Sequence, residues 1–164
     1  AEAIPEAADH FATYAWYPQR AGRADLVAER AQHFGRTADP FVRQTIAELT
    51  SFQRANEWTA ERAQAARALG RAPGPEGSLG KLAASGVARR SARVHSLIAG
   101  AQAMLTSGVD ELDAVIAEVL VSTPAQSIAG GTDEIQHNII GENILGLPRE
   151  PSVDRDVAFR DVER

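Results

Sequence analysis

The chain has 164 residues, enough for one domain to bury roughly 70% of the surface that its unfolded form exposes, so it needs no disulfide or metal to fold. It contains no cysteine, which excludes a disulfide framework and a thiolate metal site, and its net charge of −5, with acids and bases interspersed, leaves no basic face for nucleic acid. No apolar run approaches the roughly 20 residues of a membrane span and the first residues lack the order of a signal peptide, so we expect a cytoplasmic protein without a membrane or nucleic-acid partner.

The first predicted unit, residues 1–23, is an aromatic-rich segment. Four aromatic residues fall within seven positions of its sequence: Phe11, Tyr14, Trp16 and Tyr17. Such a cluster can anchor an interface or line an acyl pocket, or it can dock on the chain's own bundle. We predict that a helical domain follows over residues 24–148 and a charged tail over residues 149–164. Because the first residue is alanine, we expect a processed chain, a chain freed from a tag or a piece of a longer protein.

The first two predicted helices follow directly. The alternation of β-branched and aromatic residues that is typical of strands is missing, and a short helix is predicted over Ala24–Phe34, ended by Gly35. Asp39 and Pro40 are typical N-cap and first-turn residues of a long helix that reaches Leu69. The apolar face of this long helix is predicted to be Val42, Ile46, Leu49, Phe52, Ala63 and Ala66.

A third helix follows a connection, residues 73–77, that is too rich in proline and glycine to be helical. Ser78 is predicted to cap this helix, which reaches about Leu105. Its stripe, with small residues that allow close approach, is Val87, Ser91, Val94, Ile98, Ala101 and Leu105.

The remaining elements are shorter. Asp110 can cap a short helix, Thr123 followed by Pro124 can open a turn, and Thr132 begins a helix that closes at residues 146–148. The apolar positions of the first of these helices are Leu112, Val115, Ile116, Val119 and Leu120. We therefore predict an all-α fold, an up-and-down four-helix bundle with short additional helices.

The most specific motif runs from Ala129 to Ile140 and reads Ala-Gly-Gly-Thr-Asp-Glu-Ile-Gln-His-Asn-Ile-Ile. Gly130 and Gly131 let the backbone approach a ligand closely, and Thr132 supplies an N-cap, so that free N–H groups face whatever binds. The alternative is a well-made helix start with no ligand.

This segment, continued by Leu-Gly-Leu-Pro at positions 145–148, resembles the last helix of the acyl-CoA dehydrogenases. Two further pieces fit in the same order: residues 39–44 at the start of one long helix, and Pro-Glu-Gly-Ser at 75–78 with Gly-Lys-Leu at 80–82, similar to a branch common among actinobacterial members. The resemblance covers roughly residues 39–148. It implies the C-terminal helical-bundle domain of that family, whose other two domains, one helical and one β, have no counterpart here.

The resemblance implies FAD-dependent α,β-dehydrogenation of acyl-CoA thioesters, as in fatty acid or lipid metabolism. In this reaction a carboxylate removes the α proton while a β hydride passes to the flavin. Many members carry that glutamate directly before the Gly-Thr of the last motif, where this chain has Gly130. Glu6 and Glu29 are acids in the region where other members place the base, but neither matches a motif, so the base is unknown.

For the cofactor, the resemblance implies contacts from Gly130, Gly131, Thr132 and Glu134, and from Gln44 across a subunit interface. An exposed helical glutamine without a ligand is the alternative for Gln44. Family members also carry a glutamine and a Gly-Gly turn after the third helix, where only Gly100 matches, which argues against FAD contact there. We expect no metal, since the histidines occur in no ligand spacing: His10, His33, His95 and His137.

Two functions follow from the resemblance. The first is the C-terminal domain of a working acyl-CoA dehydrogenase, which helps to enclose FAD and to assemble a homo- or hetero-oligomer around an acyl-CoA substrate. The second is the bundle of a non-catalytic subunit that serves the assembly of a heteromeric enzyme. In both, the isolated chain is expected to be inactive.

Overall fold

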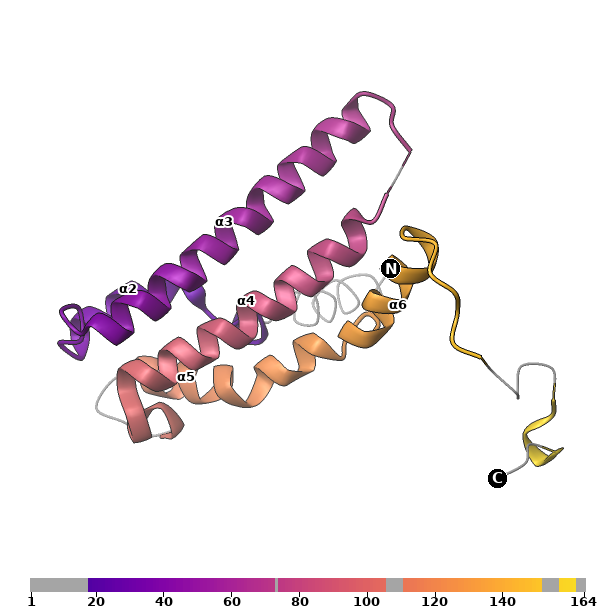
Figure 1. Ribbon diagram of the computed structural model, residues 1–164. Coiled ribbons are helices and arrows are strands. Elements are labelled where there is room, and N and C mark those ends of the chain that lie inside the picture. The colour runs from indigo at the N-terminus through magenta and orange to yellow at the C-terminus, as the bar shows by residue number, and fades with distance from the viewer. Residues whose placement is uncertain (1–17, 73, 106–110, 152–156, 162–164) are drawn as a thin grey trace, which may run out of the picture.

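The computed structural model describes residues 18–72, 74–105, 111–151 and 157–161, and all regular structure in these residues is helical (Figure 1). The elements are η1 (Pro18–Ala21), η2 (Ala24–Leu26), α2 (Val27–His33), α3 (Pro40–Ala68), α4 (Glu76–Ala99), η3 (Gly100–Met104), α5 (Glu111–Ser122), η4 (Thr123–Ser127), α6 (Asp133–Asn143) and η5 (Phe159–Asp161), where η denotes a 3₁₀ helix. Helices α3 and α4 form a long antiparallel hairpin, and α5 with α6 returns along α4 (Figure 1). The predicted all-α bundle is confirmed.

Helix α3 begins as the sequence predicts. One carboxylate oxygen of Asp39 accepts hydrogen bonds from the backbone N–H groups of Phe41 at 2.9 Å and Val42 at 3.2 Å. Pro40 occupies the first turn, where its missing N–H costs no hydrogen bond. The cap therefore fixes the start of the longest helix among the described residues.

Helix α4 differs from the prediction at both ends. It begins at Glu76, so Ser78 lies buried inside its first turn and is not the cap. It ends at Ala99 because Gly100 adopts a φ of 59°, which breaks the α-helical hydrogen-bond pattern, and the chain continues as η3. Ala101 and Leu105 are consequently exposed, so the predicted stripe was wrong at these two positions.

Two apolar clusters form the core. The first joins α2, α3 and α4 through Val27, Ala31, Val42, Leu49, Val94 and Ile98. The second joins η2, the end of α4, η3 and α5 through Leu26, Ala99, Ala103, Ile116 and Val119. Phe34 packs against both clusters, so the bundle has a continuous interior at the end where α2 ends and α3 begins.

A buried ion pair lies at this end of the bundle. Arg30 on α2 donates a hydrogen bond from Nη2 to Oδ1 of Asp113 on α5 at 2.9 Å, and their side chains are 0% and 7% exposed. The guanidinium carbon also lies 5.0 Å from the centroid of the Phe34 ring. Within the described residues, Nε and Nη1 of Arg30 have no hydrogen-bond partner. The pair therefore ties α2 to α5 through a single direct hydrogen bond.

The connection that precedes α2 lies directly on α4. Gly22 has a φ of 93°, and a Cβ atom built there would come within 2.8 Å of Cα of Ala88 and of Cβ of Ser91. The Nε2 atom of the buried His95 lies 3.0 Å from the carbonyl oxygen of Arg23. Only glycine permits this close approach of backbone to helix.

Helix α5 begins at Glu111, directly after the predicted cap Asp110, which lies outside the described residues. Helix α6 ends at Asn143, and Gly146 follows it in the left-handed region with a φ of 66°. Because α6 packs beside the first half of α4, the glycine-containing connection between η4 and α6 lies far from the start of α3 (Figure 1).

Candidate functional site

The candidate site is the turn that joins η4 to α6. Gly130 and Gly131 have φ values of 68° and 87°, in the left-handed region that favours glycine. Thr132 is extended and accepts a hydrogen bond on Oγ1 from the backbone N–H of Ile135 at 3.2 Å, which makes it the N-cap of α6. Gln136 donates a hydrogen bond from its side-chain amide to the carbonyl oxygen of Gly130 at 3.2 Å. The turn is thus closed by its own helix.

The two glycines face different surroundings. A Cβ atom at Gly131 would lie 2.8 Å from Nε2 of Gln136 and would disturb the bond that closes the turn. A Cβ atom at Gly130 would meet nothing within 4 Å, and both glycines are exposed. The outer side of the turn can therefore accept a group from a ligand or a neighbouring chain close to the backbone.

Asp133, the first residue of α6, attaches the turn to α4. Lys81 donates a hydrogen bond from Nζ to Oδ1 of Asp133 at 2.6 Å, and Arg89 donates one from Nη1 to Oδ2. The Asp133 side chain is only 8% exposed. Lys81 and Arg89 are eight positions apart on a helix with about 3.6 residues per turn, so both reach the carboxylate from one face of α4.

The ion pairs determine the protonation of Asp133. Burial raises the pKa of this carboxyl group, but the hydrogen bonds from Lys81 and Arg89, with a smaller effect of the nearby Ser85 hydroxyl, lower it more, so the pKa lies far below its usual range. The neighbouring Glu134 is exposed, and its pKa is lowered by hydrogen bonds from its own backbone and from Thr132. Both acids at the start of α6 are therefore ionised at neutral pH, which suits the positive end of the helix dipole.

The structure brings together four of the predicted cofactor contacts and separates the fifth. Gly130, Gly131, Thr132 and Glu134 share the turn and the first residues of α6. Gln44 is exposed near the start of α3, where its amide lies 3.4 Å from Oε1 of Glu48, and this end of α3 lies opposite α6 (Figure 1). Within one copy of the chain, Gln44 does not reach the turn.

The turn offers few candidates for a general base within the described residues. Gly130 has no side chain, Asp133 is held by two cations, and Glu29 is exposed on α2 at the other end of the bundle. Glu6 lies outside the described residues, as do the aromatic residues Phe11, Tyr14, Trp16 and Tyr17. The remaining acid at the turn, Glu134, is exposed, and its lowered pKa makes it a weak base.

The other end of α4 and the histidines add no second site. Gly100 is exposed and ends α4, followed by the exposed Ala101. His33 and His137 are exposed, whereas His10 lies outside the described residues. The described part of the chain contains no group of acidic and histidine side chains that could hold a metal ion.

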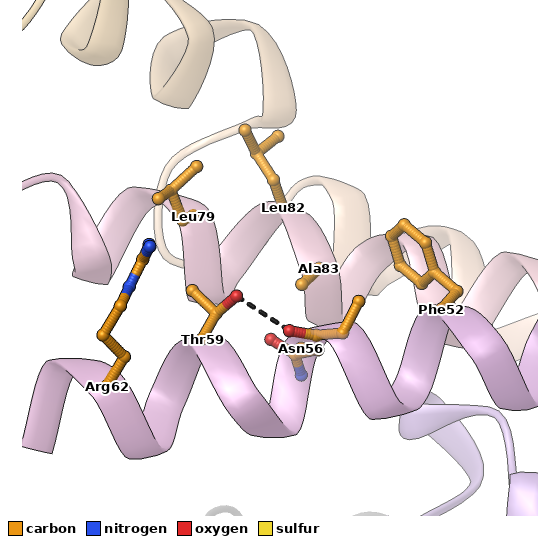
Figure 2. Close-up of a pocket in the computed structure, with 8 residues that line it drawn as sticks. Phe52, Asn56, Thr59, Arg62, Leu79, Leu82 and Ala83 are labelled. Carbon is orange, nitrogen blue, oxygen red and sulfur yellow. Dashed lines mark hydrogen bonds between the residues drawn. The ribbon is translucent and has the colours of Figure 1, made fainter.

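A pocket of about 310 Å³ lies between α3 and α4 (Figure 2). Its wall is mostly apolar, with Phe52 at one end and Leu79, Leu82 and Ala83 contributed by α4, while Arg62 lies at its other end (Figure 2). This volume is at the lower end of the range found for small-molecule sites, and Arg62 is the charged residue in its lining. The pocket is lined by residues of α4 that face α3, whereas Lys81 and Arg89 contact Asp133 at the start of α6.

The sequence reasoning missed the role of α4 in holding the turn. Lys81, Ser85 and Arg89 are spaced by four, but polar residues at this spacing usually mark a solvated helix face. One compositional signal was present, because Lys81 is the only lysine of a chain whose other sixteen basic residues are arginine. Ser85 extends the same stripe by donating to the carbonyl oxygen of Gln126 in η4 at 3.0 Å.

Comparison with known protein families identifies a match over most of the chain. A family model described as acyl-CoA dehydrogenase, C-terminal domain, matches residues 7–145. No curated protein and no solved structure matches the chain. Among the described residues, no helix combines the length and the apolar character that crossing a bilayer requires.

Proposed function

The chain belongs to the acyl-CoA dehydrogenase family through its C-terminal helical domain, and on this premise we propose that it helps to enclose FAD in a flavin-dependent acyl-CoA dehydrogenase and contributes to subunit assembly. The observation that carries the proposal is the exposed turn at Gly130, Gly131 and Thr132, at the start of an eleven-residue helix. An approaching cofactor meets backbone there instead of side chains.

The turn fits a phosphate-bearing flavin cofactor in two respects. The space outside Gly130 is open, so a large planar or charged group can come close to the peptide units. The Thr132 side chain is already oriented, because its hydroxyl oxygen accepts a hydrogen bond from the N–H of Ile135. These residues bind and orient, and the flavin, when bound, supplies the acceptor for the substrate hydride.

The contribution to the chemistry that we propose for the described residues is positioning. The described residues place no carboxylate at Gly130, where many relatives have their base. Removal of the α proton must then use a carboxylate from another segment or another subunit. The exposed start of α6 would face that group together with the thioester.

The absence of a side chain at Gly130 also supports a second candidate function. In a heteromeric enzyme, a non-catalytic subunit can provide bundle surface and one side of an FAD site without a base of its own. Exposed apolar residues follow the turn along α6 and beyond it, as a subunit interface would require: Ile135, Ile139, Ile144, Leu145 and Leu147.

Purification from the native source distinguishes the two candidates. We expect an assembly with flavin absorbance that is bleached by a saturated acyl-CoA. A flavin carried by the assembly of this protein alone supports the catalytic role, whereas a flavin that appears only with a different subunit supports the accessory role. Absence of both flavin and bleaching from every assembly that contains the chain would refute the proposal.

A substitution links the flavin to the turn. Thr132→Val removes the hydroxyl and should lower the flavin content of the assembly, whereas Thr132→Ser should retain it. Thr50→Val is the matched control, because the Thr50 hydroxyl is exposed on α3 and only donates to the carbonyl oxygen of Ile46. The 164-residue chain alone, given FAD and an electron acceptor, should not turn over acyl-CoA.

A further inference from the structure

The glycine turn is anchored to α4 on both of its sides. On its C-terminal side lies Asp133, held by Lys81 and Arg89. On its N-terminal side lies Ser127, the last residue of η4, whose carbonyl oxygen accepts from Nζ of Lys81 at 3.1 Å and whose Oγ accepts from Nη1 of Arg89 at 2.6 Å. Each of the two cations therefore contacts both ends of the turn.

This double attachment closes residues 128–132 into a loop whose base is α4. A loop held at one end can still rotate about that end, but a loop held at both ends by the same two side chains keeps its orientation. Charge-assisted hydrogen bonds of this kind are about twice as strong as neutral ones. The bond between Lys81 and Asp133 is also largely shielded from water, since the two side chains are 15% and 8% exposed. The arrangement is therefore stiffer than the exposed glycines alone suggest.

We propose that Lys81 and Arg89 are positioning residues, which act through Ser127 and Asp133 to hold the turn in its binding conformation before a ligand or partner arrives. A turn that is already ordered avoids the entropy cost of ordering when it binds. The identity of the ligand rests on the proposed function, but the ordering of the turn does not. The two parts can therefore fail separately.

The first experiment measures ordering on the 164-residue chain without ligand. Arg89→Met and Lys81→Met each remove one cation, and Arg93→Met is the matched control, because Arg93 is an exposed cation one turn further along α4. Amide hydrogen exchange is followed for residues 128–136 and, as an internal reference, for the middle of α3.

We expect exchange at residues 128–136 to become roughly ten- to hundredfold faster in both test variants, as the loss of a hydrogen bond to a charged group predicts. The Arg93 variant and the reference amides of α3 should not change. Equal acceleration in α3 would mean a loss of general stability, and unchanged exchange at the turn would mean no positioning. Either result would overturn the inference.

The second experiment tests the consequence for binding, with FAD as the probe. In the assembly purified from the native source, Arg89→Met should lower the flavin content, and Arg89→Lys, which restores a cation within reach of Asp133, should recover most of it. Unchanged flavin content in Arg89→Met would overturn the link between positioning and binding. If exchange responds as expected but the unsubstituted assembly carries no flavin, the proposed function fails and the positioning of the turn stands.

Discussion

The ion pair between Arg30 and Asp113 offers the sharpest test of the energetics of this bundle. We predict that Asp113→Ala and Arg30→Met each destabilise the fold strongly, whereas the double variant is close to the unsubstituted protein. Either single substitution leaves a charge in a place that water does not reach, since the two side chains are 0% and 7% exposed. The double variant leaves no charge behind.

The expected magnitudes follow from this burial. Removing one partner of a buried pair costs about 3–5 kcal/mol, whereas replacing both by apolar residues is often neutral. The pair in this protein is held by one direct hydrogen bond, and Nε and Nη1 of Arg30 lack partners among the described residues, so the pair itself adds little net stability. We therefore expect the double variant to lie within about 1 kcal/mol of the unsubstituted protein.

Urea denaturation followed by circular dichroism gives the four free energies of unfolding for this double-mutant cycle. The exposed pair of Arg54 and Glu57 is the control, because its contact is as short, at 2.7 Å, but its side chains are 64% and 51% exposed. Glu57→Ala should change the free energy of unfolding by less than about 1 kcal/mol. If the single losses at Arg30 and Asp113 simply add in the double variant, the two charges do not depend on each other and this reasoning is wrong.

Three further outcomes are expected. Gly22→Ala should lower the free energy of unfolding, measured by urea denaturation, by about 3 kcal/mol, because it adds left-handed backbone strain and overlap with α4. Gly35→Ala should lower it by only about 1 kcal/mol, since Gly35 has a φ of 63° and nothing lies within 4 Å of the new Cβ atom, so equal losses would contradict this prediction. Burial lowers the pKa of His95 below its ordinary value of 6.5, and the charge of Arg30 adds to this effect, whereas hydrogen bonds to the backbone and the charge of Asp25 oppose it. The contribution of His95 to stability should therefore be fully present above pH 6.5 and be lost as the pH falls through the folded-state pKa. The same slope in His95→Gln would refute that assignment. The ion pairs that lower the pKa of Asp133 stabilise the fold at pH values above 3.8, the pKa of this group in the unfolded chain, and this stability should be lost as the pH falls below that value. In Asp133→Asn, which has no carboxyl group to titrate, helicity should decrease less steeply with acid.

Local signals in the sequence predicted the helices well, because caps and breaks depend on neighbouring residues. Asp39 with Pro40 marked the start of α3, and Thr132 marked the start of α6. The end of α4 was predicted too late, because the apolar spacing continues past Gly100 although the backbone does not. Periodicity records which face a residue would occupy and cannot show where a glycine leaves the helix.

Ion pairs between residues far apart in the sequence could not be predicted from these local signals. Arg30 and Asp113 are 83 positions apart, and each alone reads as a solvated charge on a helix. The same holds for Lys81 and Asp133, 52 positions apart. Buried charge pairs depend on how helices are placed in three dimensions, which a pattern of apolar positions does not specify.

The candidate site was predicted in part for a simple reason. Gly130, Gly131, Thr132 and Glu134 are neighbours in the sequence, so a single motif identified them together. Gln44 comes from another helix, and the structure places it at the opposite end of the bundle. Its assignment depends on a second copy of the chain and stays a prediction.

The attachment of the turn at Ser127 and Asp133 has a consequence for how this part of the protein can change. The turn is attached to α4 outside residues 128–132, and a Cβ atom at position 130 would meet nothing within 4 Å. A glutamate introduced there would meet only the backbone strain of the left-handed conformation, about 1–2 kcal/mol, without repacking the helices. A glutamate at position 130 can thus be gained or lost as related sequences diverge, while the fold around the turn is kept.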